Sequence, residues 1–143
     1  MAEGDVLVVE DDRAVREILN QTFLNAGYKC LLAYDGREGF EMFRKSRPPL
    51  VITEINMPMM SGAEMVDGAG IELLKLVRRE DPDAAVIVLG VTDLKTHIAS
   101  LKLGADAHFW KPFSNDELLI AAERAIERRQ LLIERRRRGD AQP

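Results

Sequence analysis

The sequence is poor in the features that mark secreted and membrane proteins. The chain of 143 residues has a single cysteine, Cys30. It therefore cannot form an internal disulfide, which fits a reducing compartment. Its longest apolar run, around residues 84–91, has about eight residues, against the ~20 that a membrane-spanning helix needs. A charged segment, Glu10 to Asp12, comes within the first dozen residues, so no signal-peptide pattern is expected. These absences favour a cytoplasmic protein without a membrane partner.

Charge is unevenly distributed along the chain. The net charge is −4, but residues 124–138 contain seven arginines and two glutamates, so the rest of the chain carries −9. An acidic body is atypical of proteins that bind nucleic acid through a basic surface, so a nucleic-acid partner is not expected. We interpret the arginine-rich segment as a solvated helix end. Contact with nucleic acid or an acidic partner is the alternative.

Short apolar runs alternate with helical patterns about five times along the chain. This alternation predicts parallel strands joined by helical crossovers, hence an α/β fold with helices on both faces of one sheet. The length fits one domain, expected at residues 5–128, followed by a basic helical extension and tail at 129–143. The expected strands are Val6–Val9, Cys30–Ala33, Leu50–Thr53, Ala85–Leu89 and Ala107–Trp110.

Acidic residues follow two of the expected strands. Glu10, Asp11 and Asp12 come after the first strand and Glu54 after the third, while Lys111 after the fifth adds a cation. Ligands of an open parallel sheet bind beyond the carboxyl ends of its strands. Converging carboxylates need a cation, and oxygen ligands favour Mg²⁺ over zinc or copper. Taken singly, each acid could instead be a helix cap or a surface residue.

Three segments resemble the receiver domain of bacterial two-component response regulators. They are residues 6–12 (VLVVEDD), residues 50–58 (LVITEINMP), and residues 104–113, which hold Gly-Ala-Asp and Lys-Pro-Phe. They occur in order at nearly the family's spacing. The resemblance implies a flavodoxin-like, doubly wound, five-stranded parallel sheet in the order 2-1-3-4-5 with five helices. It also implies a phosphorelay partner, either a histidine kinase or a phosphotransfer protein.

The resemblance assigns roles to individual residues. Glu10 and Asp11 match the acidic pair that holds Mg²⁺. Glu54 matches the phospho-acceptor, which is also a metal ligand, and the backbone carbonyl of Asn56 completes the metal site. Lys111 matches the lysine that contacts the acceptor and the phosphoryl group, and the proline after it usually follows a cis peptide bond.

A downstream protein is expected on the face formed by the fourth helix, the fifth strand and the fifth helix. Trp110, Phe113 and Leu118 are candidates for that contact. Beyond this face, Leu131 to Ile133 extend past the expected domain. They predict either a helix–helix contact in a homodimer or the start of a linker.

Three positions depart from the family's pattern. Glu54 stands where the family has aspartate, and its extra methylene moves the carboxylate forward by about one bond length, which in-line attack tolerates poorly. Gly90 stands where the family has Ser or Thr, whose hydroxyl reaches the phosphoryl group. His108 replaces the usual Tyr or Phe of the switch. We expect it to be packed and hydrogen-bonded rather than titrating, and a zinc site with His97, expected on a helix surface, lacks a third ligand.

An insertion, Ala63–Ala69, lies within the glycine-rich segment Met57–Gly70. We expect an elongated loop or a short helical excursion there. The insertion could cover the site, form a contact surface or be neutral.

Our leading hypothesis is a single-domain, atypical receiver that is not an enzyme, is not phosphorylated at Glu54, and acts by protein contact. Its Mg²⁺ binding is expected to be weakened or lost. The alternative is a conventional phosphorelay receiver in which Glu54 is an engineered or tolerated replacement. A Mg²⁺-dependent phosphohydrolase is disfavoured because residues 10–12 lack an Asp-x-Asp pattern. A nucleotide binder is disfavoured because no glycine-rich turn follows the first strand.

Overall fold

The computed structural model describes residues 5–59, 65–66 and 68–139. Five parallel strands form its central sheet in the order β2-β1-β3-β6-β7. Counted within this sheet alone, that order is 2-1-3-4-5, so the predicted topology is confirmed. The strands are β1 (Val6–Val9), β2 (Cys30–Ala33), β3 (Leu50–Glu54), β6 (Ala85–Leu89) and β7 (Ala107–Phe109).

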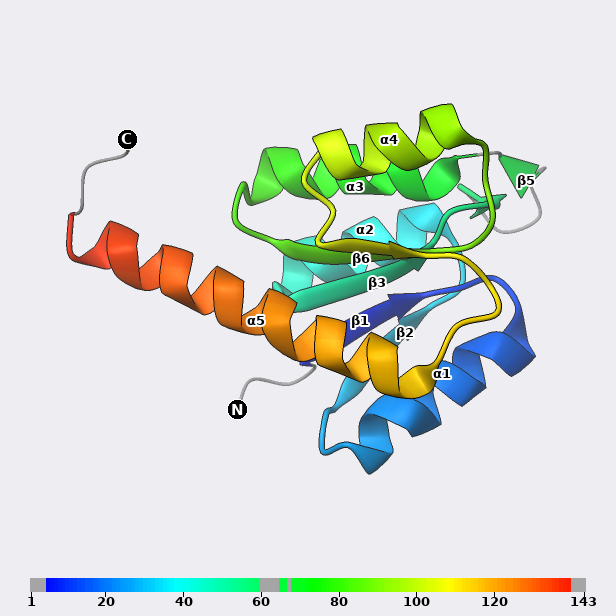
Figure 1. Cartoon of the computed structure of the whole chain (residues 1–143), viewed down its shortest axis with the longest axis horizontal. Coiled ribbons are helices and arrows are strands. Elements are labelled where there is room, and N and C mark those ends of the chain that lie inside the picture. Colours follow the sequence, from blue (N-terminus) through cyan, green and yellow to red (C-terminus); the bar gives the residue numbers. More distant parts are fainter. Residues whose placement is uncertain (1–4, 60–64, 67, 140–143) are drawn as a thin grey trace.

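Five helices cover the two faces of the sheet (Figure 1). One face carries α1 (Arg13–Asn25) and α5 (Asn115–Arg137). The other carries α2 (Gly36–Ser46), α3 (Ala69–Glu80) and α4 (Leu94–Lys102). None of the helices in the described part of the chain is long and apolar enough to cross a membrane.

Two buried clusters of apolar side chains lie on either side of the sheet. Val9 of β1 belongs to the cluster that includes Phe43 of α2, whereas its neighbour Val8 belongs to the cluster with Phe23 of α1. Because both faces are covered, successive strand residues are all buried. This explains why the strands are continuous apolar runs rather than alternating patterns.

Short polar contacts fix where the first two helices begin. The Asp12 carboxylate accepts hydrogen bonds from the backbone N–H groups of Ala14 and Val15, so Asp12 rather than Asp11 caps α1. At α2, Asp35 accepts from the Glu38 N–H while the Glu38 carboxylate accepts from the Tyr34 N–H. Such caps satisfy N–H groups that have no partner inside the helix. The caps fix the path of the chain after β1, at the edge of the sheet where the acidic residues lie.

The segment after β3 is an antiparallel ribbon. Strand β4 (Met57–Pro58) pairs with β5 (Met65–Val66), with Met57 opposite Val66. The described part of this segment thus folds back on itself as a short ribbon rather than as a helical excursion, so the elongated loop is the nearer of the two predicted forms. Ala63, Glu64 and Asp67 of the predicted insertion lie outside the described residues.

Helix α5 continues well past the sheet (Figure 1). Three of its arginines pair with aspartates of the body: Arg128 with Asp106 at 2.5 Å, Arg129 with Asp81 at 3.4 Å, and Arg136 with Asp83 at 3.1 Å. The interpretation of the arginine-rich segment as a solvated helix end was thus wrong for Arg128 and Arg129, which are only partly exposed, whereas Arg136 remains exposed while it pairs with Asp83. These pairs were not predictable from sequence because each aspartate lies at least 22 residues before its arginine.

Candidate functional site

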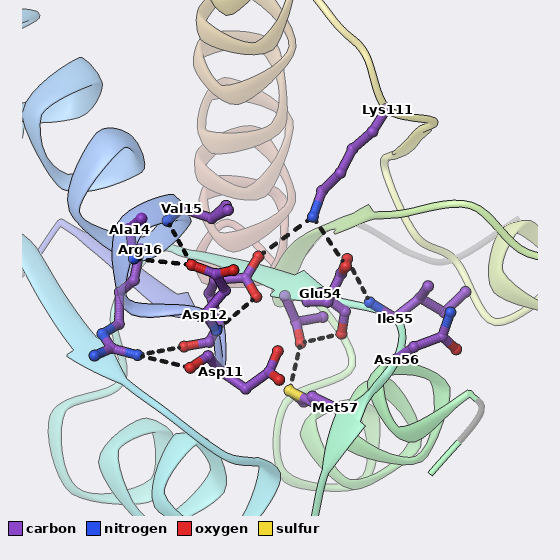
Figure 2. A network of polar contacts seen from close by, with 12 residues as sticks. Asp11, Asp12, Ala14, Val15, Arg16, Glu54, Ile55, Asn56, Met57 and Lys111 are labelled. Atoms are coloured by element: carbon purple, nitrogen blue, oxygen red, sulfur yellow. Dashed lines mark hydrogen bonds and ion pairs between the residues drawn. The ribbon is translucent and has the colours of Figure 1, made fainter. Parts of the chain in front are cut away.

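Glu10, Glu54 and Lys111 meet at the carboxyl edge of the sheet. Glu10 follows β1, Glu54 ends β3, and Lys111 lies in the segment between β7 and α5. The Lys111 ammonium lies 3.0 Å from Oε1 of Glu54 and 3.6 Å from Oε1 of Glu10. Figure 2 shows the Lys111 side chain reaching Glu54 from its own loop. The predicted cis peptide bond between Lys111 and Pro112 is present.

Glu10 is the most buried acid of the site, with an exposed fraction of 2 %. Its Oε2 accepts a hydrogen bond from the Asp12 N–H at 3.2 Å, whereas its buried Oε1 has no hydrogen-bond partner among the residues described. Burial raises the pKa of Glu10 to about 7, with further increases from the Asp11 side chain and the charge of Glu54. The Asp12 N–H and Lys111 lower that pKa without offsetting the rise. Near neutral pH the Glu10 carboxyl is therefore only partly ionised.

Lys111 remains a cation in this setting. Burial by itself lowers the pKa of its ammonium, but the hydrogen bond to Glu54 and the charges of Glu10 and Glu54 raise the pKa on balance. The ammonium therefore supplies the positive charge that the two carboxylates require.

Both carboxylate oxygens of Glu54 are engaged. Oε1 accepts from Lys111, and Oε2 accepts from the backbone N–H of Ile55 at 3.1 Å. The side chain occupies space beside Gly90, where an added Cβ would lie 2.4 Å from Oε2 and 3.0 Å from Cδ of Glu54. Gly90 also has a φ of +122°, a conformation that residues with a Cβ rarely adopt. Two of the three positions predicted to depart from the family pattern, Glu54 and Gly90, therefore lie side by side.

Asn56 connects two loops near the acceptor position. Its Nδ2 donates to the carbonyl of Val91 at 3.1 Å, and its Oδ1 accepts from the N–H of Gly68 at 3.0 Å. The side chain thus joins the segment after β6 to the start of α3. Sequence analysis assigned a role only to the Asn56 backbone carbonyl and missed this bridge.

The predicted metal ligands do not form a closed cluster. No three His, Cys, Asp or Glu side chains within the described ranges are placed to hold a metal ion. The carboxylates of Glu10 and Asp11 have the oxygen chemistry that Mg²⁺ prefers, and Oε1 of Glu10 is free of hydrogen bonds among the residues described. Glu54, however, is held by Lys111 and Ile55 and does not complete the set. The residues present fit Mg²⁺ only in part.

His108 contacts both neighbouring elements of the fold. Its Nε2 lies 2.8 Å from the carbonyl oxygen of Gly90, and its Nδ1 lies 2.9 Å from Nδ1 of His97 in α4. The expectation of a packed, hydrogen-bonded histidine is confirmed, whereas the expectation that His97 is a surface residue is wrong because its ring is half-buried against His108. Burial lowers the pKa of His108 and the neighbouring His97 lowers it further, against the hydrogen bond to Gly90.

The expected partner face is apolar, but only part of the set predicted for it is exposed, and Phe113 is half-buried. Trp110 is 42 % exposed as expected, whereas Leu118 is fully buried in the α5 cluster. In place of Leu118, Leu94 and Ile98 of α4 and Ile120 of α5 are exposed. Helical periodicity does not show which side of α4 faces outward.

Comparisons with known proteins agree with this geometry. Residues 6–123 match the family model described as the response regulator receiver domain. The response regulator MprA of Mycolicibacterium vanbaalenii is 38 % identical over 125 residues, covering 87 % of this chain and 50 % of MprA. The corresponding protein of Mycobacterium tuberculosis is 37 % identical over 125 residues, with the same shares covered. The chain thus spans about half the length of the curated relatives it matches.

Solved structures give the same result. A response regulator receiver domain protein from Clostridium thermocellum has 30 % identity and a TM-score of 0.79, covering 90 % of this chain and 98 % of that one. The chemotaxis protein CheY4 of Vibrio cholerae has 29 % identity and a TM-score of 0.73, covering 87 % of this chain and 99 % of that one. The match over residues 6–123, together with the sheet order and the carboxyl-edge site, establishes that the chain belongs to the response regulator receiver domain family of two-component systems.

Proposed function

We propose that this receiver is an atypical signalling module that is not phosphorylated at position 54 and acts by protein contact rather than catalysis. One observation carries the proposal: both oxygens of the Glu54 carboxylate are already engaged, one of them by Lys111, which the resemblance assigns to the acceptor and its phosphoryl group. Lys111 holds one oxygen, the Ile55 N–H holds the other, and Gly90 provides the space. The receiver part comprises residues 5–128, and residues 129–143 form its basic extension.

The chemistry of the site supports this proposal. Phosphoryl transfer in line requires an oxygen placed to within about one ångström of the attacking position. Instead, one Glu54 oxygen accepts a hydrogen bond from Lys111 and the other accepts one from the Ile55 N–H. A carboxylate carries one negative charge, against about −1.5 to −2 for a phosphate group, so Glu54 imitates the phosphorylated state only in part. Mg²⁺ bound by Glu10 and Asp11 would supply positive charge for the acidic edge, and its affinity is weakened because Glu54 is held elsewhere.

The partners are proteins of a phosphorelay. The family interacts with histidine kinases and downstream effectors. For this chain we assign the downstream contact to the α4–β7–α5 face, where Leu94, Ile98, Trp110 and Ile120 are exposed. A second copy of the chain is a further partner, meeting the exposed Leu131 of the α5 extension.

Intact-protein mass after incubation with acetyl phosphate and Mg²⁺ tests the proposal. Three proteins are compared: the native chain, Glu54→Asp, and the double variant Glu54→Asp/Gly90→Thr. The native chain should gain no phosphoryl mass. The double variant should gain one, because it regains both a short acceptor and a hydroxyl near it. Glu54→Asp alone should react more slowly than the double variant.

The alternative function, a conventional receiver with Glu54 as a tolerated acceptor, predicts a phosphoryl group on the native chain. That result would overturn the proposal. Failure of all three proteins to react would place the block outside positions 54 and 90, and would contradict the role given to Glu54.

A further inference from the structure

The contact between His97 and His108 is chemically specific because it joins two ring nitrogens directly. The two Nδ1 atoms lie 2.9 Å apart, and the ring centroids lie 4.8 Å apart. Between two imidazole nitrogens a hydrogen bond requires one N–H and one lone pair. The pair therefore exists only when one of these two nitrogens is unprotonated.

The second hydrogen bond of His108 decides which nitrogen that is. The carbonyl oxygen of Gly90 can only accept, so Nε2 of His108, at 2.8 Å, carries the proton. A neutral His108 then has an unprotonated Nδ1, and His97 donates from its Nδ1. A proton added to His97 at Nε2 preserves this arrangement. A further proton added to Nδ1 of His108 turns both facing nitrogens into donors and removes the bond.

Other attachments of α4 lie at its C-terminal end, where the Ala105 N–H donates to the Ser100 carbonyl and Arg78 of α3 donates to the Leu103 carbonyl. Ser100 is its only buried residue, and the Ser100 hydroxyl bonds back to the carbonyl of His97 in the same helix. Its apolar residues Leu94, Ile98 and Leu101 are exposed rather than packed. The hydrogen bond to His108 is therefore a substantial part of what fixes α4 to the sheet.

We infer that His97 and His108 form a proton-sensitive latch that holds α4 against β7 and opens when both imidazoles are protonated. No third His, Cys, Asp or Glu in the described part of the chain joins the pair into a metal site, so we assign the latch to protons rather than to a metal ion. The lowered pKa of His108 agrees with a closed latch that resists protonation. The inference concerns α4 itself and is independent of the chemistry at Glu54.

The charged groups around the pair do not compensate a doubly protonated latch. Val88 of β6 and Gly90, which follows that strand, are the neighbours of His108 on this side and are uncharged. Asp106 is paired with Arg128, Lys111 is paired with Glu54, and Asp93 accepts from the Thr96 N–H at the start of α4. The remaining charges on α4 are Lys95 and Lys102, which add to the positive side.

Opening of the latch would affect two neighbouring groups, the Trp110 ring and the Gly90 carbonyl. Trp110 lies with its ring centroid 6.0 Å from both imidazoles, and it is part of the proposed partner face. The Gly90 carbonyl would lose its donor next to the Glu54 carboxylate. Mild acid should thus alter the α4–β7 surface, and any effect on partner binding rests on the proposed function.

Amide hydrogen exchange followed by NMR at pH 7.5 and pH 5.5, corrected for intrinsic rates, tests the latch in the full chain. Protection of residues 94–102 should fall about two- to tenfold at the lower pH, the range expected for loss of one neutral hydrogen bond. Helix α1, on the opposite face of the sheet, serves as the internal reference and should keep its protection. Nitrogen shifts at pH 7.5 should show His108 protonated at Nε2.

Two variants, His108→Phe and His97→Phe, serve as controls because each lacks the hydrogen bond between the two imidazoles. Each should show weaker α4 protection than the native chain at pH 7.5 and no further fall at pH 5.5. Unchanged native protection of α4 relative to α1, an equal fall in either variant, or His108 protonated at Nδ1 would each overturn the latch. Since none of these readouts involves phosphorylation, the latch and the proposed function can fail separately.

Discussion

Gly90 and Glu54 fit together sterically: a Cβ built on Gly90 would lie 2.4 Å from the Glu54 carboxylate. Real Cβ atoms are not found so close to another heavy atom. The long acidic side chain at position 54 therefore fits only because the residue after β6 has no side chain. The effect of a substitution at either position therefore depends on which residue is present at the other.

The first prediction concerns the coupling of these two residues. Gly90→Ala should destabilise the native chain by about 2–4 kcal/mol, from backbone strain at φ +122° and overlap with Glu54. The same change in a Glu54→Asp background keeps the strain and the close contact with Ile55 but loses the overlap with Glu54. A double-mutant cycle measured by urea unfolding should give a coupling of about 1–2 kcal/mol. Additive effects would show that Glu54 does not occupy the space beside Gly90.

The second prediction concerns pH and Glu10, in the presence of EDTA. Because the pKa of Glu10 is raised from 4.5 to about 7 on folding, the folded state binds the proton more tightly than the unfolded state. The contribution of Glu10 to stability is therefore present below pH 4.5 and is lost as pH rises through about 7. Glu10→Gln should be more stable than the native chain at pH 8 by roughly 1–3 kcal/mol. The two proteins should have similar stability at pH 4.5, and equal stability at both pH values would contradict the raised pKa.

The third prediction concerns the attachment of α5. Asp106 accepts from Arg128 and also from the backbone N–H of Val86 at the start of β6. Arg128→Ala should therefore cost about 1–3 kcal/mol by leaving a largely buried carboxylate without its cation. Arg124→Ala, on the exposed side of the same helix, should stay within about 0.5 kcal/mol of the native chain. Urea unfolding compares them, and equal costs would show that the Arg128–Asp106 pair adds nothing.

The fourth prediction concerns Mg²⁺. Glu54→Asp shortens the side chain and should release it from the Ile55 N–H, leaving a carboxylate able to join Glu10 and Asp11. Calorimetric titration should then give an affinity for Mg²⁺ at least tenfold higher than that of the native chain, a gain of about 1.4 kcal/mol or more. Ca²⁺ serves as the comparison ion, since it tolerates looser geometry. Equal Mg²⁺ affinities in the two proteins would mean that Glu54 does not limit the site.

The sheet and the meeting of Glu10, Glu54 and Lys111 could be predicted because each depends on local sequence. Buried parallel strands are unbroken apolar runs, and the ends of parallel strands share one edge of the sheet. Knowing the order of the strands was then sufficient to bring residues 10, 54 and 111 together.

What could not be predicted depends on contacts between residues distant in sequence. The space beside Gly90 is filled by a side chain 36 residues earlier, and no pattern around either residue reveals it. The His97–His108 bond depends on how α4 is rotated about its axis. The same uncertainty misplaced Leu118, because helical periodicity shows that a helix has an apolar stripe but not what covers it.

The Glu54 carboxylate is attached to its chain by carbon–carbon bonds, which water does not cleave. A phosphorylated aspartate is an acyl phosphate, and its hydrolysis limits how long an ordinary receiver remains phosphorylated. In the function proposed for this chain no hydrolysis step removes the charge: every copy carries it from synthesis to degradation. The strength of its signal then follows the number of copies in the cell, and its time course follows their turnover.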